Sequence, residues 1–444
     1  MLKTFKIGGI HPPEFKLTSH SPIRQLSASQ NVTIPISQHI GAPATILVNK
    51  GDYLRTGQLI ASINGYVSSN IHSSVSGNVN KIDTIIDTTG YKQTAIVIDV
   101  AGDEWMETID RSPVLEREIK ATAEEIVEKC REAGIVGLGG ASFPSHVKLS
   151  VPKGKKCDIL LINGVECEPY LTSDHRLMLE RGNEILVGVS IIMKALSVDR
   201  AIIGIENNKP DAIENLTNLA KEFNGITVQA LKVKYPQGGE KQLIKALINR
   251  EVPPGHLPID VGAVVHNVGT AYAVYEALQK NKPLFERVVT ITGKSLSNPG
   301  NYIVRIGTPV RHLIEAAGGI PEDTGKIING GPMMGKALNN IDVPIVKGTS
   351  GIVLFPAKES KRDEVKPCIR CAKCIAACGF TLEPNLLATL SEKGLFERAE
   401  EEMITSCMEC GSCSYICPAN RPLLDYIRLG KSTVIKMAKQ RNIK

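Results

Sequence analysis

The sequence predicts a multidomain protein of mixed α/β and α+β class. A small β-rich domain, a layered α/β domain and a small α+β domain precede a cysteine-rich helical domain. Three observations support this prediction. Short strands broken by Gly and Pro occupy residues 30–80, helix and strand patterns alternate over residues 115–280, and eight of the 11 cysteines form two late runs. A chain of 444 residues is also too long for one hydrophobic core.

The first domain, residues 1–112, is rich in turn residues between short strands, which predicts a small β-barrel or sandwich. Its pattern resembles the lipoyl/biotinyl fold, the barrel-sandwich hybrid. Carrier domains of that fold have a lysine at a hairpin tip, where this chain has Asn64-Gly65-Tyr66-Val67. The resemblance therefore implies a docking or scaffold role instead of a swinging arm.

Residues 113–283 form the predicted α/β domain. We expect strands at residues 159–162, 201–205 and 226–233, and helices at residues 123–133 and 184–196, after Pro210 and from Glu240. Such alternation predicts a sheet layered with helices and ligand-binding residues at the strand ends.

Residues 284–356 change to strands, a turn and a short helix, which fit a small β-grasp similar to the SLBB module. The charged stretch from Lys358 to Lys366 predicts a linker into the last domain, residues 357–430. Residues 431–444 form a basic tail.

The late cysteines repeat one spacing, C-x2-C-x2-C-x3-C, which is the ligand pattern of two [4Fe–4S] clusters. Three thiolates of a run can wrap one cluster, and in two-cluster ferredoxins the fourth ligates the other cluster. The predicted ligand sets are Cys368, Cys371, Cys374 and Cys417 for one cluster, and Cys407, Cys410, Cys413 and Cys378 for the other.

Zinc sites and disulfides are the alternatives to clusters. Zinc usually takes paired C-x2-C motifs, and disulfides need an oxidising compartment, whereas nothing at the N-terminus resembles a secretory signal. Apolar residues at helical spacing between the runs, after Pro384, predict two short helices that fold one run back onto the other. We expect Cys130, Cys157 and Cys167 to be reduced structural thiols.

The sequence argues against a transmembrane helix and against nucleic-acid binding. No uncharged apolar run approaches 18 residues, which predicts no transmembrane helix, and no basic–aromatic platform for nucleic acid accompanies the net charge of +6. The basic tail has two interpretations: contact with an acidic partner or anionic lipid headgroups, or a frayed and solvated end.

Four segments of the α/β domain are candidate ligand loops: GLGGASFP at residues 137–144 with Lys148 after it, NGVECEPY at 163–170, YPQGGE at 235–240 and VHNVGT at 265–270. Glycines let backbone N–H groups approach an anion, and a nearby lysine adds positive charge. Polar groups at the carboxyl end of a strand are well placed to meet a ring or a ribose.

In this order the segments resemble the flavin- and NADH-binding 51-kDa subunit of respiratory complex I. The resemblance implies that Gly137, Gly139 and Lys148 cradle the FMN phosphate and that Phe143 and Glu168 meet the nicotinamide nucleotide, with Glu240 close to both. It implies that the following residues line FMN: Asn163, Glu166, Tyr235, Gly238, Asn267 and Thr270. Gly140, Gly239 and His266 complete the predicted cofactor site.

The chain departs from that family at several positions. Val165 replaces an aspartate, Gly239 replaces a glutamate and His266 replaces an asparagine. A basic residue expected before Pro253-Pro254 is replaced by Val252. Hydride transfer from NADH to a flavin needs no protein acid or base, so we assign His266 a lining role and no residue a catalytic one.

The whole chain resembles the C-subunit family of the Rnf complex, the ion-translocating ferredoxin:NAD+ oxidoreductase. The GGIHPPEFK opening, the two loops after residues 136 and 162 and the paired cysteine runs support the resemblance over residues 3–430. It implies an oxidoreductase subunit with non-covalent FMN, two [4Fe–4S] clusters and NAD(H) as substrate, in a complex that couples electron transfer to Na+ or H+ translocation. It also implies a peripheral location on the cytoplasmic face of the membrane. Its partners would be other Rnf subunits, including the membrane subunits and the iron–sulfur B subunit, and indirectly ferredoxin.

Two alternatives stay open at the level of sequence. A cobalamin reductase of the propanediol-utilisation type is similar in the barrel and the clusters. An electron-transfer scaffold without NADH oxidation would fit the departures at Val165 and Gly239.

Overall fold

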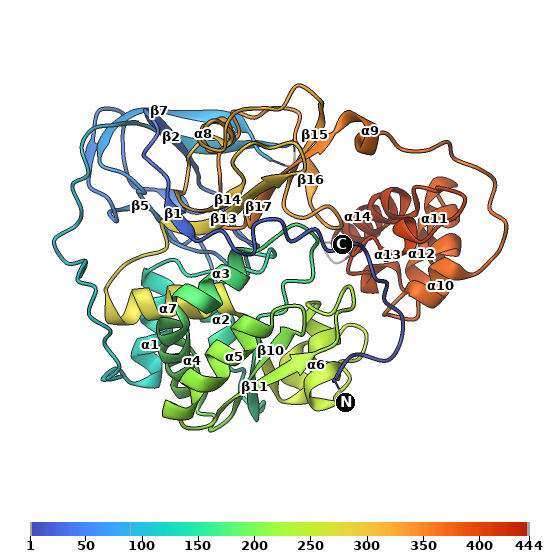
Figure 1. Ribbon diagram of the computed structural model, residues 1–444, viewed down its shortest axis with the longest axis horizontal. Helices are drawn as coiled ribbons and strands as arrows, with labels where there is room; N and C mark the ends of the chain where they lie inside the picture. The colour runs from blue at the N-terminus through green and yellow to red at the C-terminus, as the bar shows by residue number, and fades with distance from the viewer. Residues whose placement is uncertain (1, 89, 442–444) are drawn as a thin grey trace.

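The computed structural model describes residues 2–88 and 90–441. Figure 1 shows a broad body and, at its right, a helical lobe. The body contains the four β-sheets of the described residues. The parallel sheet and its helices occupy the lower part of the view, and the other sheets lie above.

Two small antiparallel sheets, ordered β2-β8-β7-β4 and β3-β5-β6, form the N-terminal domain. Their strands are β2 (Asn31–Pro35), β3 (Thr45–Ile46), β4 (Tyr53–Leu54), β5 (Leu59–Ser62), β6 (Ile71–His72), β7 (Gly77–Ile86) and β8 (Lys92–Val100). Alternation along β2 buries Val32 and Ile34 while Asn31 is exposed, as a sheet with one face on the core requires. The predicted small β-barrel or sandwich is confirmed.

A four-stranded parallel sheet, ordered β11-β10-β9-β12, is the centre of the α/β domain. Its strands are β9 (Ile159–Asn163), β10 (Ala201–Glu206), β11 (Ile226–Leu231) and β12 (Ala263–Asn267). The first four residues of β9 are all buried, because helices cover both faces of the sheet.

The helices of this domain are α1 (Ala123–Glu132), α2 (Ser145–Leu149), α3 (Ser173–Glu180), α4 (Gly182–Leu196), α5 (Pro210–Leu219), α6 (Glu240–Ile248) and α7 (Val268–Gln279), with short 3-10 turns η1 (Ala220–Glu222) and η2 (Pro258–Val261). Helix α1 begins at Thr122, whose hydroxyl accepts from the Glu125 N–H while the Glu125 carboxylate accepts from the Thr122 N–H. The helices and strands predicted in this domain are present, although the strand predicted at residues 226–233 ends at Leu231 and the helix predicted at 123–133 ends at Glu132.

A six-stranded mixed sheet follows, ordered β1-β14-β13-β17-β15-β16. Its elements are β1 (Ile23–Gln25), β13 (Glu286–Gly293), β14 (Gly300–Arg305), β15 (Thr324–Asn329), β16 (Lys336–Ala337) and β17 (Gly351–Pro356), with helix α8 (Val310–Ala316). Strand β1 comes from the N-terminus and pairs in parallel with β14, where Ile23 lies opposite Asn301. The sequence did not predict this crossover, and the residue limits of the domains stay predictions.

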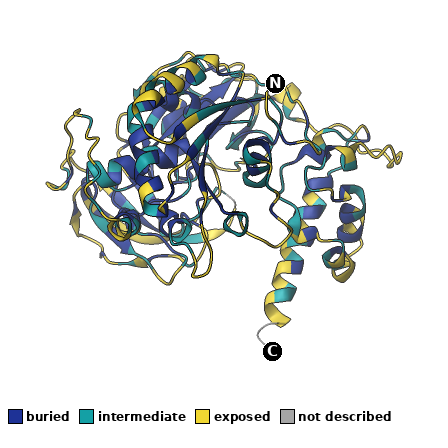
Figure 2. Cartoon of the chain, turned by 90° about the horizontal axis from the view of Figure 1, so that it is seen from below, coloured by how far each residue is buried: buried dark blue, intermediate teal, exposed yellow. Residues whose placement is uncertain are grey.

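The helical lobe contains α10 (Lys373–Ala377), α11 (Pro384–Glu392), α12 (Phe396–Glu401), η3 (Ile404–Ser406), α13 (Ser412–Tyr415) and α14 (Leu423–Arg441), and it is reached through α9 (Ala357–Ser360). The two helices predicted between the cysteine runs are α11 and α12. A Cβ on Gly430 would lie 2.1 Å from the Ser391 hydroxyl, so the glycine lets α14 approach α11 closely. Figure 2 shows the end of α14 projecting from the lobe with exposed residues.

Residues 3–25, here called the N-terminal strap, link three parts of the molecule. Lys3 pairs with Leu231 and Ile10 pairs with Tyr235 in isolated bridges to the α/β domain. The Gly9 N–H donates to the Ala377 carbonyl of the lobe at 2.9 Å. Further along, β1 joins the six-stranded sheet. Among residues 2–88 and 90–441, no helix combines the length and the apolar character that a membrane crossing requires.

Candidate functional site

The four candidate ligand loops meet at the carboxyl edge of the parallel sheet. Asn163 ends β9 and Asn267 ends β12, side by side in register. The Asn163 amide donates to the Gly238 carbonyl at 2.9 Å, and the Asn267 amide lies 3.4 Å from the Asn163 carbonyl. The edge of the sheet therefore brings together the loops after β9, β11 and β12, where ligands of parallel α/β sheets bind.

The glycine-rich loop packs directly on this edge. The Leu138 N–H donates to the Thr270 hydroxyl at 2.9 Å. A Cβ on Gly139 would lie 3.4 Å from the Asn267 Cβ, and Gly140 has a φ of +115°, which glycine adopts without strain. This close backbone approach to Asn267 and Thr270 fits a loop that cradles a phosphate group.

Lys148 joins two of the loops. Its ammonium donates to the Glu240 carboxylate at 2.7 Å and to the Val265 carbonyl at 3.0 Å. The predicted phosphate-binding lysine, a residue of α2, is thus held by the start of α6 and by β12, beside the other candidate residues.

His266 is buried, and its Nε2 has no hydrogen-bond partner among the described residues. Burial, reinforced by the charge of Lys148, lowers the pKa of this imidazole to about 3, so the ring is neutral at pH 7. A neutral ring with an unpartnered nitrogen fits the lining of a cofactor site. Burial also raises the pKa of the Cys167 thiol, which accepts from the Gly238 N–H at 3.4 Å.

The Glu166 carboxylate lies at the start of α3. It accepts from the N–H groups of Asp174 at 2.8 Å and His175 at 3.2 Å. This carboxylate stabilises the helix N-terminus, where four N–H groups lack partners within the helix. The Glu166 side chain therefore points to the N-terminus of α3, where its carboxylate is hydrogen-bonded.

Glu168 is covered by residues 330–335 of the six-stranded-sheet domain. Its carboxylate accepts from the N–H groups of Met333 at 3.1 Å and Met334 at 2.9 Å. A Cβ on Gly331 would lie 2.2 Å from the Glu168 Oε2, so only glycine fits there. Burial raises the pKa of Glu168 to about 7, against the opposing effect of the two N–H donors. Phe143, the other residue predicted to meet the nicotinamide nucleotide, is half-buried in its own loop.

Two cations that the sequence analysis missed hold these loops. Lys16 donates to the carbonyls of Glu166 at 2.8 Å and Glu168 at 2.9 Å. Arg287 donates to the Leu138 carbonyl at 3.3 Å and to the Lys347 carbonyl. The GGIHPPEFK motif contained Lys16 as a signal, whereas Arg287 lies in the ordinary strand β13 and gave none.

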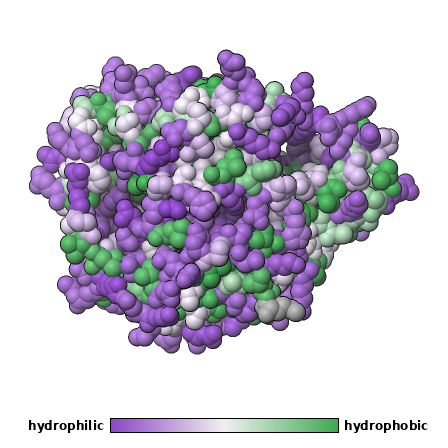
Figure 3. Space-filling view, in the orientation of Figure 1, coloured by the Kyte–Doolittle hydropathy of each residue, from purple (hydrophilic) through white to green (hydrophobic). Residues whose placement is uncertain are grey.

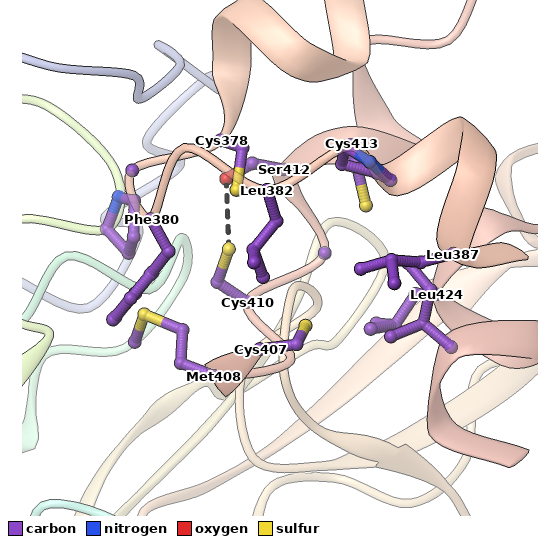
Figure 4. A pocket seen from close by; sticks show the side chains of 15 residues that line it. Cys378, Phe380, Leu382, Leu387, Cys407, Met408, Cys410, Ser412, Cys413 and Leu424 are labelled. Carbon is purple, nitrogen blue, oxygen red and sulfur yellow. Dashed lines mark hydrogen bonds between the residues drawn. The ribbon is translucent and has the colours of Figure 1, made fainter. Parts of the chain in front are cut away.

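The eight late cysteines line two cavities in the lobe. Cys378, Cys407, Cys410 and Cys413 line the first, here called the inner cavity, together with apolar side chains such as Leu382, Leu387 and Leu424 (Figure 4). Cys368, Cys371, Cys374 and Cys417 line the second, the outer cavity. Each run thus sends its fourth cysteine to the cavity of the other run, which is the grouping that the spacing predicts.

The sulfurs of each set surround a space. Among residues 2–88 and 90–441, no three His, Cys, Asp or Glu side chains converge closely enough to hold a single metal ion. None of the 11 cysteines, all of which lie among the described residues, is paired in a disulfide. Four thiols around an otherwise apolar space, as in the inner cavity, fit a cubane cluster with one thiolate per iron.

The inner cavity adjoins the candidate flavin loops. Pro236 is part of its lining, and the neighbouring Tyr235 hydroxyl donates to the Cys410 carbonyl at 2.8 Å. On the other side, a Cβ on Gly8 of the strap would lie 2.5 Å from the Cys378 carbonyl carbon. The lining of the outer cavity comes only from residues 368–375, 385 and 417–423 of the lobe.

Three family models match successive parts of the chain. Residues 3–103 match the RnfC barrel sandwich hybrid domain, residues 130–276 match the Nuo51 FMN-binding domain, and residues 288–337 match the SLBB domain. These matches confirm the predicted fold of three domains.

Curated relatives cover nearly the whole chain. The chain is 48% identical over 437 residues to the C subunit of the proton-translocating ferredoxin:NAD(+) oxidoreductase complex of Clostridium ljungdahlii, covering 97% of this chain and 94% of the relative. It is 42% identical over 441 residues to the C subunit of the Na(+)-translocating ferredoxin:NAD(+) oxidoreductase complex of Acetobacterium woodii, covering 99% of both.

One solved structure supports the fold. A chain of the NAD+-reducing [NiFe]-hydrogenase in the air-oxidized state superposes with a TM-score of 0.51 at 17% identity, covering 70% of this chain and 66% of that chain. At this identity the likeness concerns the fold alone.

Proposed function

Because this chain belongs to the family of C subunits of ion-translocating ferredoxin:NAD(+) oxidoreductase complexes, we propose that it passes electrons between NAD(H), FMN and two [4Fe–4S] clusters within such a complex. The match to an FMN-binding domain over residues 130–276 supports the flavin part of the proposal. The single observation that carries the electron path is the contact of Tyr235, in a candidate flavin loop, with the backbone of Cys410, in a candidate cluster loop.

FMN would be held non-covalently at the carboxyl edge of the parallel sheet. Gly137, Gly139, Gly140 and Lys148 would hold its phosphate, and the residues that would line the rest are Asn163, Tyr235, Gly238, Gly239, Glu240, His266, Asn267 and Thr270. Bound there, FMN would supply the conversion between hydride transfer and single-electron transfer, and the clusters would carry single electrons. NADH would approach past Phe143. Glu166 and Glu168 would hold the loop of residues 163–170 in place through their hydrogen bonds to α3 and to residues 333–334.

The two cavities suggest an order for the clusters. The inner cavity touches Pro236 of a flavin loop, whereas the outer cavity is lined by the lobe alone. Electrons from the flavin would therefore reach the inner cluster first and leave from the outer one.

The partners would be the other subunits of the complex, among them the membrane subunits and the iron–sulfur B subunit, with ferredoxin acting through them. The chain would lie at the cytoplasmic face of the membrane as a peripheral subunit. The relatives from Clostridium ljungdahlii and Acetobacterium woodii are both named as subunits of translocating complexes, which favours this role over a cobalamin reductase.

Anaerobic cofactor analysis and NADH titration test the proposal. We expect about eight iron atoms and one FMN per purified chain, as two four-iron clusters and one flavin site require. NADH should bleach the flavin absorbance and then the cluster absorbance. A chain that holds iron and FMN yet shows no bleaching with NADH would be an electron-transfer scaffold, and the proposed NADH reaction would be wrong.

A further inference from the structure

The outer cavity is covered by an exposed segment of chain. Residues 361–373, here called the outer face, run from α9 to the start of α10, and every one of them is exposed. Cys368, Ile369, Arg370, Cys371 and Ala372 of this segment also line the cavity. The wall between the outer cavity and solvent is therefore one layer of chain.

The centre of the outer face is apolar. Ile369 is 68% exposed and Val365 is 56% exposed. Figure 3 shows hydrophobic side chains over the lobe at the right of the view. Strongly exposed aliphatic side chains beside a functional cavity are typical of a surface that another protein covers.

Basic residues flank these two aliphatic residues in the sequence of the outer face. Residues 361–373 contain five basic and two acidic residues. Arg362 pairs with Asp425. Lys366, Arg370 and Lys373 are exposed and form no ion pair with any residue of 2–88 or 90–441. A surface of this kind is complementary to acidic side chains.

We propose that the outer face is the docking surface for an electron-transfer protein or domain that presents acidic side chains around its own redox centre. The proposal rests on the proposed function, because it takes the outer cavity as the end of the electron path. The apolar centre brings the two redox centres close, and the basic residues orient the acidic partner as it approaches.

The test uses an acidic plant-type [2Fe–2S] ferredoxin as the probe and a triple variant of the whole chain, Lys366→Glu, Arg370→Glu and Lys373→Glu. The matched control reverses three exposed lysines elsewhere that also lack ion pairs with described residues, Lys50→Glu, Lys92→Glu and Lys153→Glu. Both triples change the net charge equally. Iron content per chain establishes that the clusters remain.

Binding is measured first, by biolayer interferometry at low and high salt, without NADH. We expect the outer-face triple to weaken ferredoxin binding at low salt by about tenfold or more and to reduce its salt dependence, whereas the control triple changes little. Electron exchange is measured second. The outer-face triple should slow transfer from reduced ferredoxin and speed transfer to the basic protein cytochrome c. Equal effects of the two triples, or no effect of the outer-face triple, would overturn the proposal.

Anionic vesicles of phosphatidylglycerol provide the competing outcome. If the outer-face triple abolishes vesicle binding and leaves ferredoxin binding intact, the surface contacts lipid and the proposal is wrong. If NADH does not bleach the cofactors but ferredoxin binding still depends on the outer face, the proposed function is wrong and the docking proposal stands.

Discussion

Gly8 shows how one residue can set the contact between two candidate cofactor sites. It lies in the strap against Cys378 of the inner cavity, and two residues later Ile10 pairs with Tyr235 of the candidate flavin loop. The Ile10 N–H donates to the Tyr235 carbonyl at 2.8 Å, and the Gly9 N–H donates to the Ala377 carbonyl at 2.9 Å. The strap therefore holds the cluster loop against the flavin loop through its backbone.

A Gly8→Ala substitution tests this contact. The new methyl would lie 2.5 Å from the Cys378 carbonyl carbon, so the cluster loop would have to move. We expect a loss of about 2–3 kcal/mol in the free energy of unfolding and an altered EPR signal of the reduced inner cluster. The measurements are anaerobic denaturation and EPR.

Gly255→Ala is the matched control. Gly255 has a φ of +74°, against +73° for Gly8, but a Cβ there would meet no atom within 4 Å. The control therefore measures backbone strain alone, about 1–2 kcal/mol, with an unchanged EPR signal. Equal results for the two variants would mean that the strap does not position the cluster.

At the scale of elements, the short helices of the lobe decide which cysteines meet. Helices α11 and α12 reverse the chain between the runs. Cys417 follows α13 and lines the outer cavity, whereas Cys378 follows α10 and lines the inner cavity. Each cluster would therefore depend on both runs, and neither run could assemble a complete site alone.

Replacing Cys417 with Ser should remove the outer cluster. We expect about four of the eight iron atoms to be lost and the EPR signal of the inner cluster to remain. Cys378→Ser is the reciprocal control and should damage the inner cluster instead. Loss of the inner signal from Cys417→Ser would show that each run ligates its own cluster.

At the scale of the whole molecule, Lys347 joins three domains. It precedes β17, is 1% exposed, and donates to the carbonyls of Asn70 at 2.8 Å and Gly134 at 2.7 Å. Asn70 belongs to the barrel-sandwich domain and Gly134 follows α1 of the α/β domain. This buried side chain satisfies carbonyl groups where the domains meet.

Burial lowers the pKa of Lys347 from 10.5 to about 7. Between those values the unfolded chain binds a proton that the folded chain has released, so this lysine makes the folded state more stable as pH rises. Lys347→Met should lower the free energy of unfolding by about 2 kcal/mol at pH 7, because two carbonyls lose their donor. The deficit should be larger at pH 9 than at pH 7.

Thermal unfolding midpoints at pH 7 and pH 9 check this prediction. Lys153→Met, at an exposed lysine, is the control and should change neither the midpoint nor its pH dependence. A deficit that shrinks as pH rises would mean that the folded protein favours the ammonium form of Lys347, and the prediction would then be wrong.

Short stretches of sequence were enough to predict many elements of this protein. Apolar residues at helical spacing predicted α1, α4 and α6, and short continuous apolar runs predicted β9 and β10, because burial acts on near neighbours in the sequence. The cysteine spacing predicted the two ligand sets that the cavities group, because ligand geometry constrains the chain locally. The glycine-rich segments marked the loops that meet at the sheet edge, since close backbone approach needs glycine.

Only the tertiary structure decided how those pieces meet. It added β1 to a sheet built more than 250 residues later. Residues 330–335 cover Glu168, and the N-terminus of α3 donates to Glu166. Two predicted ligand carboxylates therefore have hydrogen-bond partners within the protein. The tertiary structure also set Gly8 against Cys378. These contacts join residues distant in sequence, and they depend on which complete surfaces fit together, a property that no local pattern encodes.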